Sequence, residues 1–526
     1  MKKCTLSLMI VALFACSASA EQWKVLGTRP MGMGGAFVAM AQGPMAQYWN
    51  PAGLAMASAD TVSGIELPAT LNMEMTGDIM KNVSSVGDMA SKFKTINDAQ
   101  RTGTATNADQ MAAFVKTLTL LDDMNGSGKG AMIEASIGVN LKLSKIAVSV
   151  NNFTTTGLNP YVDVYNIGLG AITAEGTTSG GITMSGVQAT STTNSSYDPA
   201  RDTIADAIDK LGGLAAISNL ICGTSDGITH QNIGITDNTT LANALVNQAI
   251  ANNLTVTQVT DAANQLDTYA IDAKPIIQSA SSGNSYANNQ SNLTVDLTSF
   301  TEIAFGYGKF MKFLEGFSIG GNLKMINGCI GQSRFKFMQE SQTEDAFNDT
   351  NDITKSSWAP AIDLGFLWDV NKKYPKLLMS PKVGFVIRNI NSPSFDRPDT
   401  VGGTYKLDRQ ARLGFALQPA RFWNLLIDID ATKNKTAVNG FDSQQFALGT
   451  EINIINRKQF NIPLRAGICK NMAESSSKMA YTLGAGVNMC YIHFDLAGAV
   501  SSDSTTLDDN EIHAKASFSA VLGMLF

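Results

Sequence analysis

Apolar and polar residues alternate one by one along most of the second half of the chain. Ile362, Leu364 and Phe366, for example, alternate with Asp363 and Gly365. A period of two is typical of a β-strand that has one apolar and one polar face. The pattern predicts fourteen strands, at residues 61–74, 131–142, 144–152, 296–310, 315–338, 357–370, 380–391, 406–418, 422–433, 442–456, 460–470, 480–488, 490–500 and 511–526.

Short and long connections alternate between these predicted strands. The short ones include residues 419–421, whereas 339–356, 392–405, 434–441 and 501–510 are long. Outer-membrane barrels join their strands in this way, with short periplasmic turns and long external loops. Acidic side chains on the polar faces would be costly against lipid but stable in a water-filled lumen. We therefore predict an all-β fold, a 14-stranded antiparallel transmembrane β-barrel at 61–526.

Both ends of the chain indicate export to the outer membrane of a Gram-negative bacterium. A basic start precedes an apolar run at 6–15 and an A-x-A cleavage signal at 18–20, so we predict a signal peptide at 1–20. A loose lipoprotein box ending at Cys16 is the alternative. The last strand closes on Phe526, an aromatic end that resembles the outer-membrane barrel signal.

Two connections are too long to be simple loops. Residues 75–130 contain a helical patch near 107–121, and 153–295 form an insertion rich in Thr, Ser, Asn and Ala. Within it, apolar residues at helical spacing predict a helix that Asp198 would cap, with Pro199 at its first position. We predict a partly helical extracellular insertion over the barrel mouth. It is either a surface for a protein partner or a decoration without a ligand.

Composition narrows the function. Charged residues make up only 16%, and the formal net charge of −6 argues against nucleic-acid binding. No apolar run of 18 residues follows the signal, so no transmembrane helix is predicted. The three histidines lie far apart, and no zinc spacing, metal site or cofactor is indicated. No serine nucleophile motif lies near His493 or His513, so we predict a protein that is not an enzyme.

Residues 21–60 precede the first predicted strand and are rich in glycine and alanine. They are too apolar for a free tail and too short for a domain. Fourteen strands enclose a lumen that side chains alone do not fill. We therefore predict that 21–60 form a plug, or hatch, inside the barrel.

The stretch RPMGMGGAFVAMAQGPMAQYWNPAGLA, at 29–55, resembles the N-terminal hatch of the FadL family of outer-membrane transporters for hydrophobic compounds. The matching motifs are Gly-Met-Gly-Gly-Ala at 32–36 and Asn-Pro-Ala at 50–52. Later stretches, at 383–395, 405–419 and 425–434, resemble the TraF-type conjugal transfer proteins more closely. Neither resemblance covers 153–295.

The FadL resemblance implies passive uptake of hydrophobic small molecules, such as long-chain fatty acids, past the hatch. The TraF resemblance implies the alternative, a barrel serving a conjugal-transfer or secretion assembly. The barrel would contact outer-membrane lipid and function as a monomer, since a closed barrel with its own plug needs no partner. The resemblance also implies a gap in the wall at the third strand, near Asn151 and Asn152.

The candidate site lies in the hatch. Asn50 would fix a turn by hydrogen bonds, Pro51 would set its φ angle, and the three aromatic residues would line a pocket or simply pack against the wall. The candidate ligand-binding and hatch residues are Gly32, Gly34, Gly35, Phe37, Tyr48, Trp49, Asn50, Pro51 and Ala52.

Overall fold

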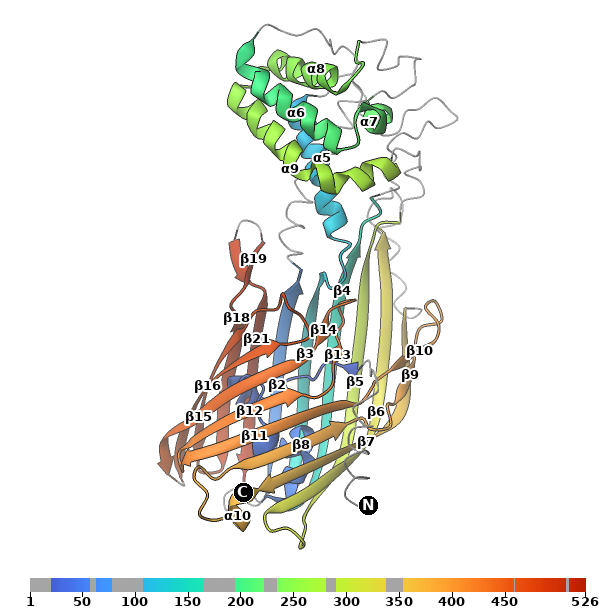
Figure 1. Cartoon of the computed structure of the whole chain (residues 1–526). Coiled ribbons are helices and arrows are strands. Elements are labelled where there is room, and N and C mark those ends of the chain that lie inside the picture. The colour runs from blue at the N-terminus through green and yellow to red at the C-terminus, as the bar shows by residue number, and fades with distance from the viewer. Residues whose placement is uncertain are drawn as a thin grey trace, which may run out of the picture.

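The computed structural model shows a β-barrel that carries a helical domain at one end (Figure 1). It describes residues 20–56, 63–77, 107–164, 194–221, 234–280, 290–336, 353–457, 459–507 and 510–526. The predicted signal peptide and residues 57–60 of the predicted hatch lie outside the described residues, apart from the backbone of Ala20.

Fourteen strands close into an antiparallel barrel, which confirms the predicted fold class. Each strand pairs with the next along the chain, and β21 pairs with β2 to close the ring. The barrel strands are β2 (Ser63–Thr76), β3 (Gly130–Leu143), β4 (Ile146–Tyr161), β5 (Asn292–Phe310), β6 (Phe317–Lys336), β7 (Thr354–Asp369), β8 (Lys382–Arg388), β11 (Gln410–Ala420), β12 (Trp423–Asp430), β15 (Gln445–Arg457), β16 (Phe460–Asn471), β17 (Ala480–Met489), β18 (Ile492–Ser501) and β21 (Lys515–Leu525).

The alternating sequence places apolar side chains outside and polar side chains inside. On β3, Ile133 and Ile137 are exposed, whereas Glu134 and Ser136 between them are buried towards the lumen. An apolar outer face is stable only against lipid, and a polar inner face only against water or other polar groups. The chain is therefore an outer-membrane barrel. Among the residues described, no helix is long and apolar enough to cross a membrane.

Two connections that were predicted as external loops fold into the lumen instead. Residues 389–409 carry the hairpin β9 (Ser394–Asp396) and β10 (Thr404–Lys406), and Phe395 packs on Phe300 of β5 with ring centroids 5.2 Å apart. In residues 431–443, Val438 packs against Met132 of β3. The prediction was wrong here because these apolar residues bury themselves against inward-facing wall positions.

The N-terminal strand β1 (Ala20–Glu21) lies beside the second of these inward loops. It pairs in parallel with β13 (Asn434–Lys435), which pairs in turn with β14 (Asp442–Ser443). The start of the N-terminal segment is thus tied to a loop from the opposite half of the sequence.

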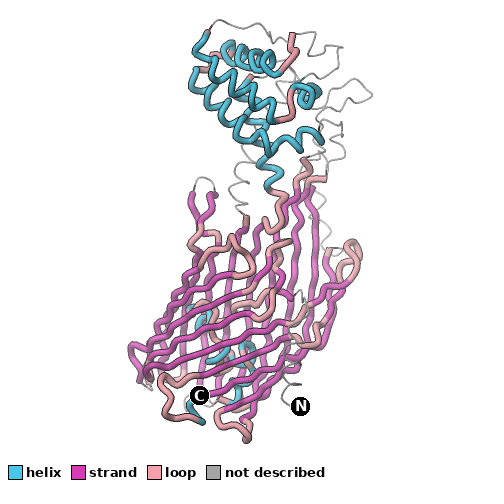
Figure 2. Tube along the Cα trace, in the orientation of Figure 1, coloured by secondary structure: helices cyan, strands magenta, loops and turns pink. Residues whose placement is uncertain are grey.

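The helices outside the barrel gather in one domain (Figure 2), which is built from two separate insertions. Helix α5 comes from the connection between β2 and β3, and the others come from the connection between β4 and β5. Their apolar faces form one buried cluster. The helices are α5 (Ala108–Asp123), α6 (Asp198–Lys210), α7 (Leu214–Ile221), α8 (Asn238–Ala251) and α9 (Val256–Ala280).

Two details of the predicted insertion need correction. Strand β4 continues to Tyr161 and β5 begins at Asn292, because the two strands stay paired along this whole length. The insertion is therefore shorter than 153–295. Helix α6 has Tyr197 at its N-cap, so Asp198 is the first helical residue rather than the cap.

Candidate functional site in the barrel lumen

Residues 20–56 descend through the lumen, and three short elements within them pack on different parts of the wall. Helix α2 (Thr28–Gly32) packs on β16, β17, β18 and β21, and the 3-10 turn η1 (Val38–Met40) packs on β8, β11 and β12. After α3 (Ala46–Trp49), the 3-10 turn η2 (Pro51–Ala55) packs on β5, β6 and β7. The segment therefore crosses the lumen from one wall to the other (Figure 1).

Glycines permit the close approach to the β16 wall. Gly34 has a φ of 71°, and a Cβ atom there would lie 2.5 Å from the carbonyl oxygen of Ile468. A Cβ on Gly32 would lie 3.0 Å from that of Arg465. Gly35 also has a positive φ, of 98°, and its carbonyl accepts a hydrogen bond from Arg412 at 3.4 Å. Only glycine combines this backbone conformation with so small a volume.

Asn50 joins two parts of the segment to the wall. Its Oδ1 accepts from the N–H of Ala52 at 3.1 Å and so caps η2, in which Pro51 is the first residue. Its Nδ2 donates to the carbonyl of Val38 at 3.1 Å and to that of Phe366 on β7 at 3.0 Å. Asn50 is completely buried. All the polar atoms of its side chain therefore have partners, as burial requires.

The aromatic residues form one cluster rather than an open pocket. Trp49 lies edge-on to Phe37, Tyr48 packs against Phe153 of β4, and Trp23 lies against Trp49. Burial raises the pKa of Tyr48 to about 12, although the charge of Arg388 opposes this. The phenol therefore stays protonated and donates to the carbonyl of Lys24 at 2.7 Å.

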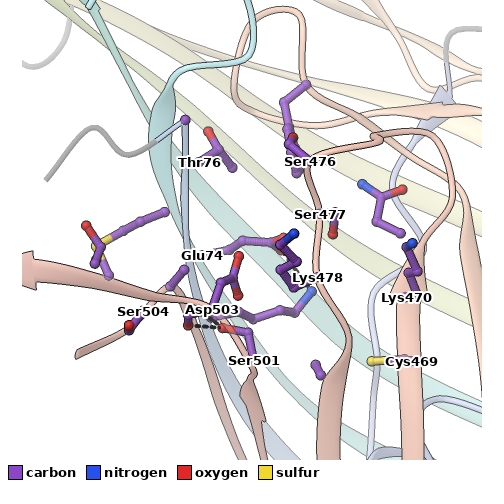
Figure 3. Close-up of a pocket in the computed structure, with 18 of the residues that line it drawn as sticks. Glu74, Thr76, Cys469, Lys470, Ser476, Ser477, Lys478, Ser501, Asp503 and Ser504 are labelled. Carbon is purple, nitrogen blue, oxygen red and sulfur yellow. Dashed lines mark hydrogen bonds and ion pairs between the residues drawn. The ribbon is translucent and has the colours of Figure 1, made fainter. Parts of the chain in front are cut away.

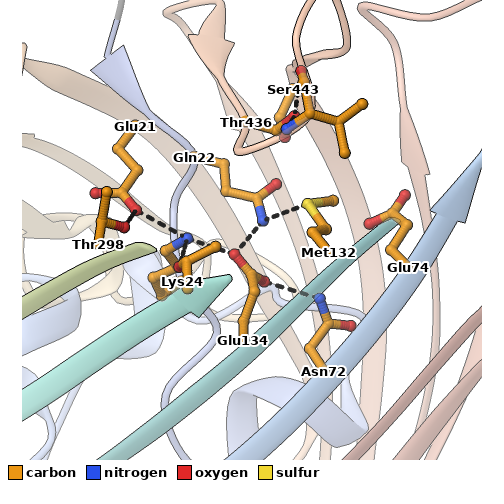
Figure 4. A network of polar contacts seen from close by, with 12 residues as sticks. Glu21, Gln22, Lys24, Asn72, Glu74, Met132, Glu134, Thr298, Thr436 and Ser443 are labelled. Atoms are coloured by element: carbon orange, nitrogen blue, oxygen red, sulfur yellow. Dashed lines mark hydrogen bonds and ion pairs between the residues drawn. The ribbon is translucent and has the colours of Figure 1, made fainter. Parts of the chain in front are cut away.

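A polar network anchors the upper end of the segment (Figure 4). Both Gln22 and Lys24 donate to the carboxylate of Glu134 on β3, which also accepts from Asn72 at 2.8 Å. Lys24 donates further to Thr155 at 2.8 Å. Burial lowers the pKa of Lys24, but the carboxylates of Glu134 and Glu21 raise it well above its ordinary value.

Two further anchors lie lower in the lumen. Asp428 of β12 accepts from the N–H groups of Phe37 and Val38 at 2.8 and 2.9 Å. Arg29 donates to Glu451 of β15 with two bonds, at 2.7 and 2.8 Å. The alternation pattern had placed such acidic residues inside, but it did not show which segment they would hold.

Two neighbouring cavities lie above and beside the segment. The outer one, at the mouth, has a volume of about 330 Å³ and is lined by polar residues that include Glu74 and Asp503 (Figure 3). The inner one, of about 70 Å³, is lined by Gly34, Gly35 and Trp23 of the segment. The two share a set of lining residues, which are Gln445, Cys469 and Lys515.

Most of the predicted site residues do not line these cavities. Gly34 and Gly35 line the inner cavity, and Tyr48 lines a small void of about 20 Å³ beside Arg388. The other predicted residues pack within the segment or against the wall. None of these three cavities is lined by Gly32, Phe37, Trp49, Asn50, Pro51 or Ala52.

The wall is closed at the third strand, where the resemblance implied a gap. Asn151 pairs with Gly138 of β3 and with Glu302 of β5, and Asn152 is paired on both sides as well. The ladders continue without a register shift across this region. Asn151 also exchanges two side-chain hydrogen bonds with Asn140. The implied opening at this strand is therefore absent.

Comparison with solved structures finds barrels of similar extent. The Pseudomonas putida toluene transporter TodX is 10% identical, with a TM-score of 0.38, over 96% of this chain and 98% of that one. The monoaromatic hydrocarbon channel CymD is 10% identical, with a TM-score of 0.41, over 96% and 99%. A Pseudomonas aeruginosa FadL homologue is 8% identical, with a TM-score of 0.35, over 96% and 98%. No curated protein matches the chain.

A family model matches most of the chain. It is described as the F plasmid transfer operon TraF protein, and it aligns with residues 47–430, from the end of the N-terminal segment through β12. This confirms the TraF-type resemblance seen in the sequence. The chain therefore belongs to this TraF family of outer-membrane barrels.

Proposed function

We propose that the protein is an outer-membrane channel for hydrophobic small molecules, in which residues 21–60 act as a hatch. The helical domain would stand outside the cell, because short turns mark the periplasmic end of such barrels and it lies at the other end. The resemblance of residues 29–55 to the FadL hatch supports the role of 21–60 as a hatch.

The observation that carries the proposal is the pair of neighbouring cavities, which share three lining residues. The outer cavity is of a size that suits a small molecule. The inner cavity lies directly beside it, and its lining includes Trp23, Val25 and Met31 of the segment. A solute at the mouth would therefore be separated from the segment only by the side chains that the two cavities share.

Passage requires the segment to move. The inner cavity, of about 70 Å³, is much smaller than the roughly 300–1,000 Å³ of typical ligand pockets. Gly34 and Gly35 lie at its edge, where their positive φ angles already define a turn. We infer that this turn is the part that a solute displaces first.

A role in a conjugal-transfer or surface assembly is the second candidate. Family membership favours it, and so does the helical domain, which offers a large surface for a protein partner. In that case the lumen would stay closed and the helical domain would carry the function.

Native mass spectrometry of protein extracted from outer membranes in mild detergent tests both candidates. A defined apolar ligand on the wild type, weakened in Asn50→Ala, is expected for a channel with a hatch. Asn391→Ala, which alters a side chain bonded to the outer part of β7, is the matched control. Retention of a protein partner without any small ligand would reject the channel and favour the assembly role.

A further inference from the structure

The connection between β7 and β8 differs from the other turns at its end of the barrel. It runs over 370–381 and begins with the short helix α10 (Val370–Lys373), at the same end of the barrel as the C-terminus (Figure 1). The neighbouring turn at 311–316 is shorter. The other turns that the structure describes in full at this end, at 144–145, 421–422 and 490–491, are shorter still. A long turn at this end needs a reason.

Large apolar side chains project from these two turns. Leu378 is 85% exposed and Phe313 is 74% exposed, and three more residues in the longer turn are also exposed. An exposed apolar patch on a folded protein marks a surface that another molecule covers. The five apolar residues are Phe313, Tyr374, Leu377, Leu378 and Met379.

The same turns carry four lysines, and none of the four forms an ion pair with a described residue. Lys373 lies over the ring of Tyr374, with its Nζ 5.4 Å from the ring centroid. The acidic residues nearby are Glu315 and Asp369. The patch thus has an excess of positive charge. The lysines are Lys312, Lys372, Lys373 and Lys376.

The longer turn is held in place by the barrel. The N–H of Val370 donates to the carbonyl of Pro381 at 3.1 Å, and the N–H of Gln418 on β11 donates to the carbonyl of Met379 at 2.6 Å. Met379 and Ser380 have positive φ angles of 61° and 39°. Such angles are unusual for residues other than glycine and persist where the surroundings impose them. The exposed side chains are therefore presented by a defined backbone.

The patch continues the lipid-facing surface of the barrel. Phe313 lies 5.6 Å from Phe317, and Phe366 lies between Phe317 and Phe385 with centroids 6.4 Å from each. Phe317, Phe366 and Phe385 come from β6, β7 and β8, respectively, and lie on the outer, lipid-facing sides of these strands. Aromatic rows of this kind mark the membrane–water interface of barrels. The lysines and leucines thus lie at the boundary between the hydrocarbon layer and the lipid headgroups.

We propose that the turns at 311–316 and 370–381 form a binding site for an anionic phospholipid of the periplasmic leaflet. The lysines hold the headgroup phosphate, while the Leu377–Met379 tip and Phe313 reach the acyl chains. Basic and apolar side chains together are what an anionic membrane surface attracts. Continuity with the lipid-facing aromatic row favours lipid over a periplasmic protein. This site is independent of what the lumen transports.

Native mass spectrometry of the full chain with equal amounts of phosphatidylglycerol and phosphatidylethanolamine tests the site. The triple variant Lys372→Gln/Lys373→Gln/Lys376→Gln is expected to bind phosphatidylglycerol at least about fivefold more weakly, since one lysine near a charged surface contributes roughly fivefold. Binding of phosphatidylethanolamine is expected to stay unchanged. The variant Leu377→Ser/Leu378→Ser is expected to weaken both lipids.

Lys210→Gln/Lys274→Gln/Lys478→Gln is the matched control, because it removes three positive charges at the opposite end of the molecule. Retained heat-modifiable mobility shows that each variant has folded. Equal phosphatidylglycerol binding by the wild type and the triple variant would overturn the proposal. A periplasmic protein that the wild type retains and the triple variant loses, with lipid binding unaltered, would also overturn it and identify a protein interface.

Discussion

Asn50 is the residue on which the fold of the N-terminal segment depends most directly. Asn50→Ala removes three hydrogen bonds and leaves the carbonyls of Val38 and Phe366 without this buried donor. We expect a loss on the order of 3 kcal/mol in the stability of the segment. Trp23 and Trp49 lie in the segment, so urea titration followed by tryptophan fluorescence measures the change.

Asn50→Asp separates the two functions of this side chain. Aspartate keeps an acceptor for the N–H of Ala52 but turns a buried carboxylate oxygen towards the two carbonyl oxygens. A buried charge without a positive partner is costly, so this variant is expected to be less stable than Asn50→Ala. Identical urea midpoints for the wild type and both variants would show that the segment does not depend on Asn50.

The buried pair of Lys24 and Glu134 gives a second prediction at this scale. Lys24→Met leaves Glu134 without its positive partner, although Gln22 and Asn72 still donate to it. Breaking a buried ion pair costs about 3–5 kcal/mol. The double variant Lys24→Met/Glu134→Gln is expected to recover much of that loss in the urea titration. A double variant no more stable than the single one would contradict this account.

The raised pKa of Lys24 fixes how this pair responds to pH. Its folded pKa lies above the unfolded value of about 10.4, so its contribution is fully present below that pH. The contribution is lost as the pH rises from there through the folded pKa. The stability difference between the wild type and Lys24→Met is therefore expected to be constant from pH 6 to about pH 10. A difference that fell within this range would disprove the assignment.

At the scale of elements, helix α8 depends on its first turn. Asp237 accepts from the N–H of Thr240 at 2.8 Å, and Thr240 accepts from the N–H of Asp237 at 3.0 Å. Asp237→Ala is expected to cost about 1 kcal/mol, whereas Asp237→Ser keeps the cap. Thermal unfolding followed at 222 nm measures this on the full chain, because the helical domain has a core of its own.

The pKa of Asp237 gives the cap a pH dependence. The backbone hydrogen bond from Thr240 lowers this pKa below its unfolded value of about 3.9. The stabilisation is therefore present above that pH and is lost as the pH falls through the folded pKa. Asp237→Ala and the wild type are expected to converge in melting temperature at low pH. Asp237→Ser, which does not titrate, would keep its advantage over Asp237→Ala.

The barrel strands could be predicted from the sequence because alternation is a local property. The inward course of 389–409 could not be predicted. It depends on the packing of Phe395 on Gly328, two residues that are far apart in sequence. A polar stretch also has the same composition whether its loop lies outside the barrel or inside it. The glycines and Asn50 of the segment carried a local signal. The anchors Glu134 and Asp428 did not, because an inward carboxylate does not show what it will bind.

At the scale of the whole molecule, the helical domain depends on both of its insertions. Helix α5 packs against α9, and its buried residues, which include Met111 and Phe114, belong to the core shared with the second insertion. The ends of both insertions lie on paired strands, since Thr76 pairs with Gly130 and Tyr161 pairs with Asn292. Each insertion can therefore be replaced by a short turn.

These pairings predict different outcomes for two deletions. Replacing 162–291 alone uncovers the apolar face of α5, so we expect that variant to aggregate or to lose the helix. Replacing 77–129 as well removes the exposed helix, so the remaining barrel is expected to fold and to show heat-modifiable mobility. Far-UV circular dichroism and gel mobility compare the two. A single deletion that folds as well as the double one would show that α5 needs no cover, and a double deletion that fails to fold would make the helical domain part of the barrel's own stability.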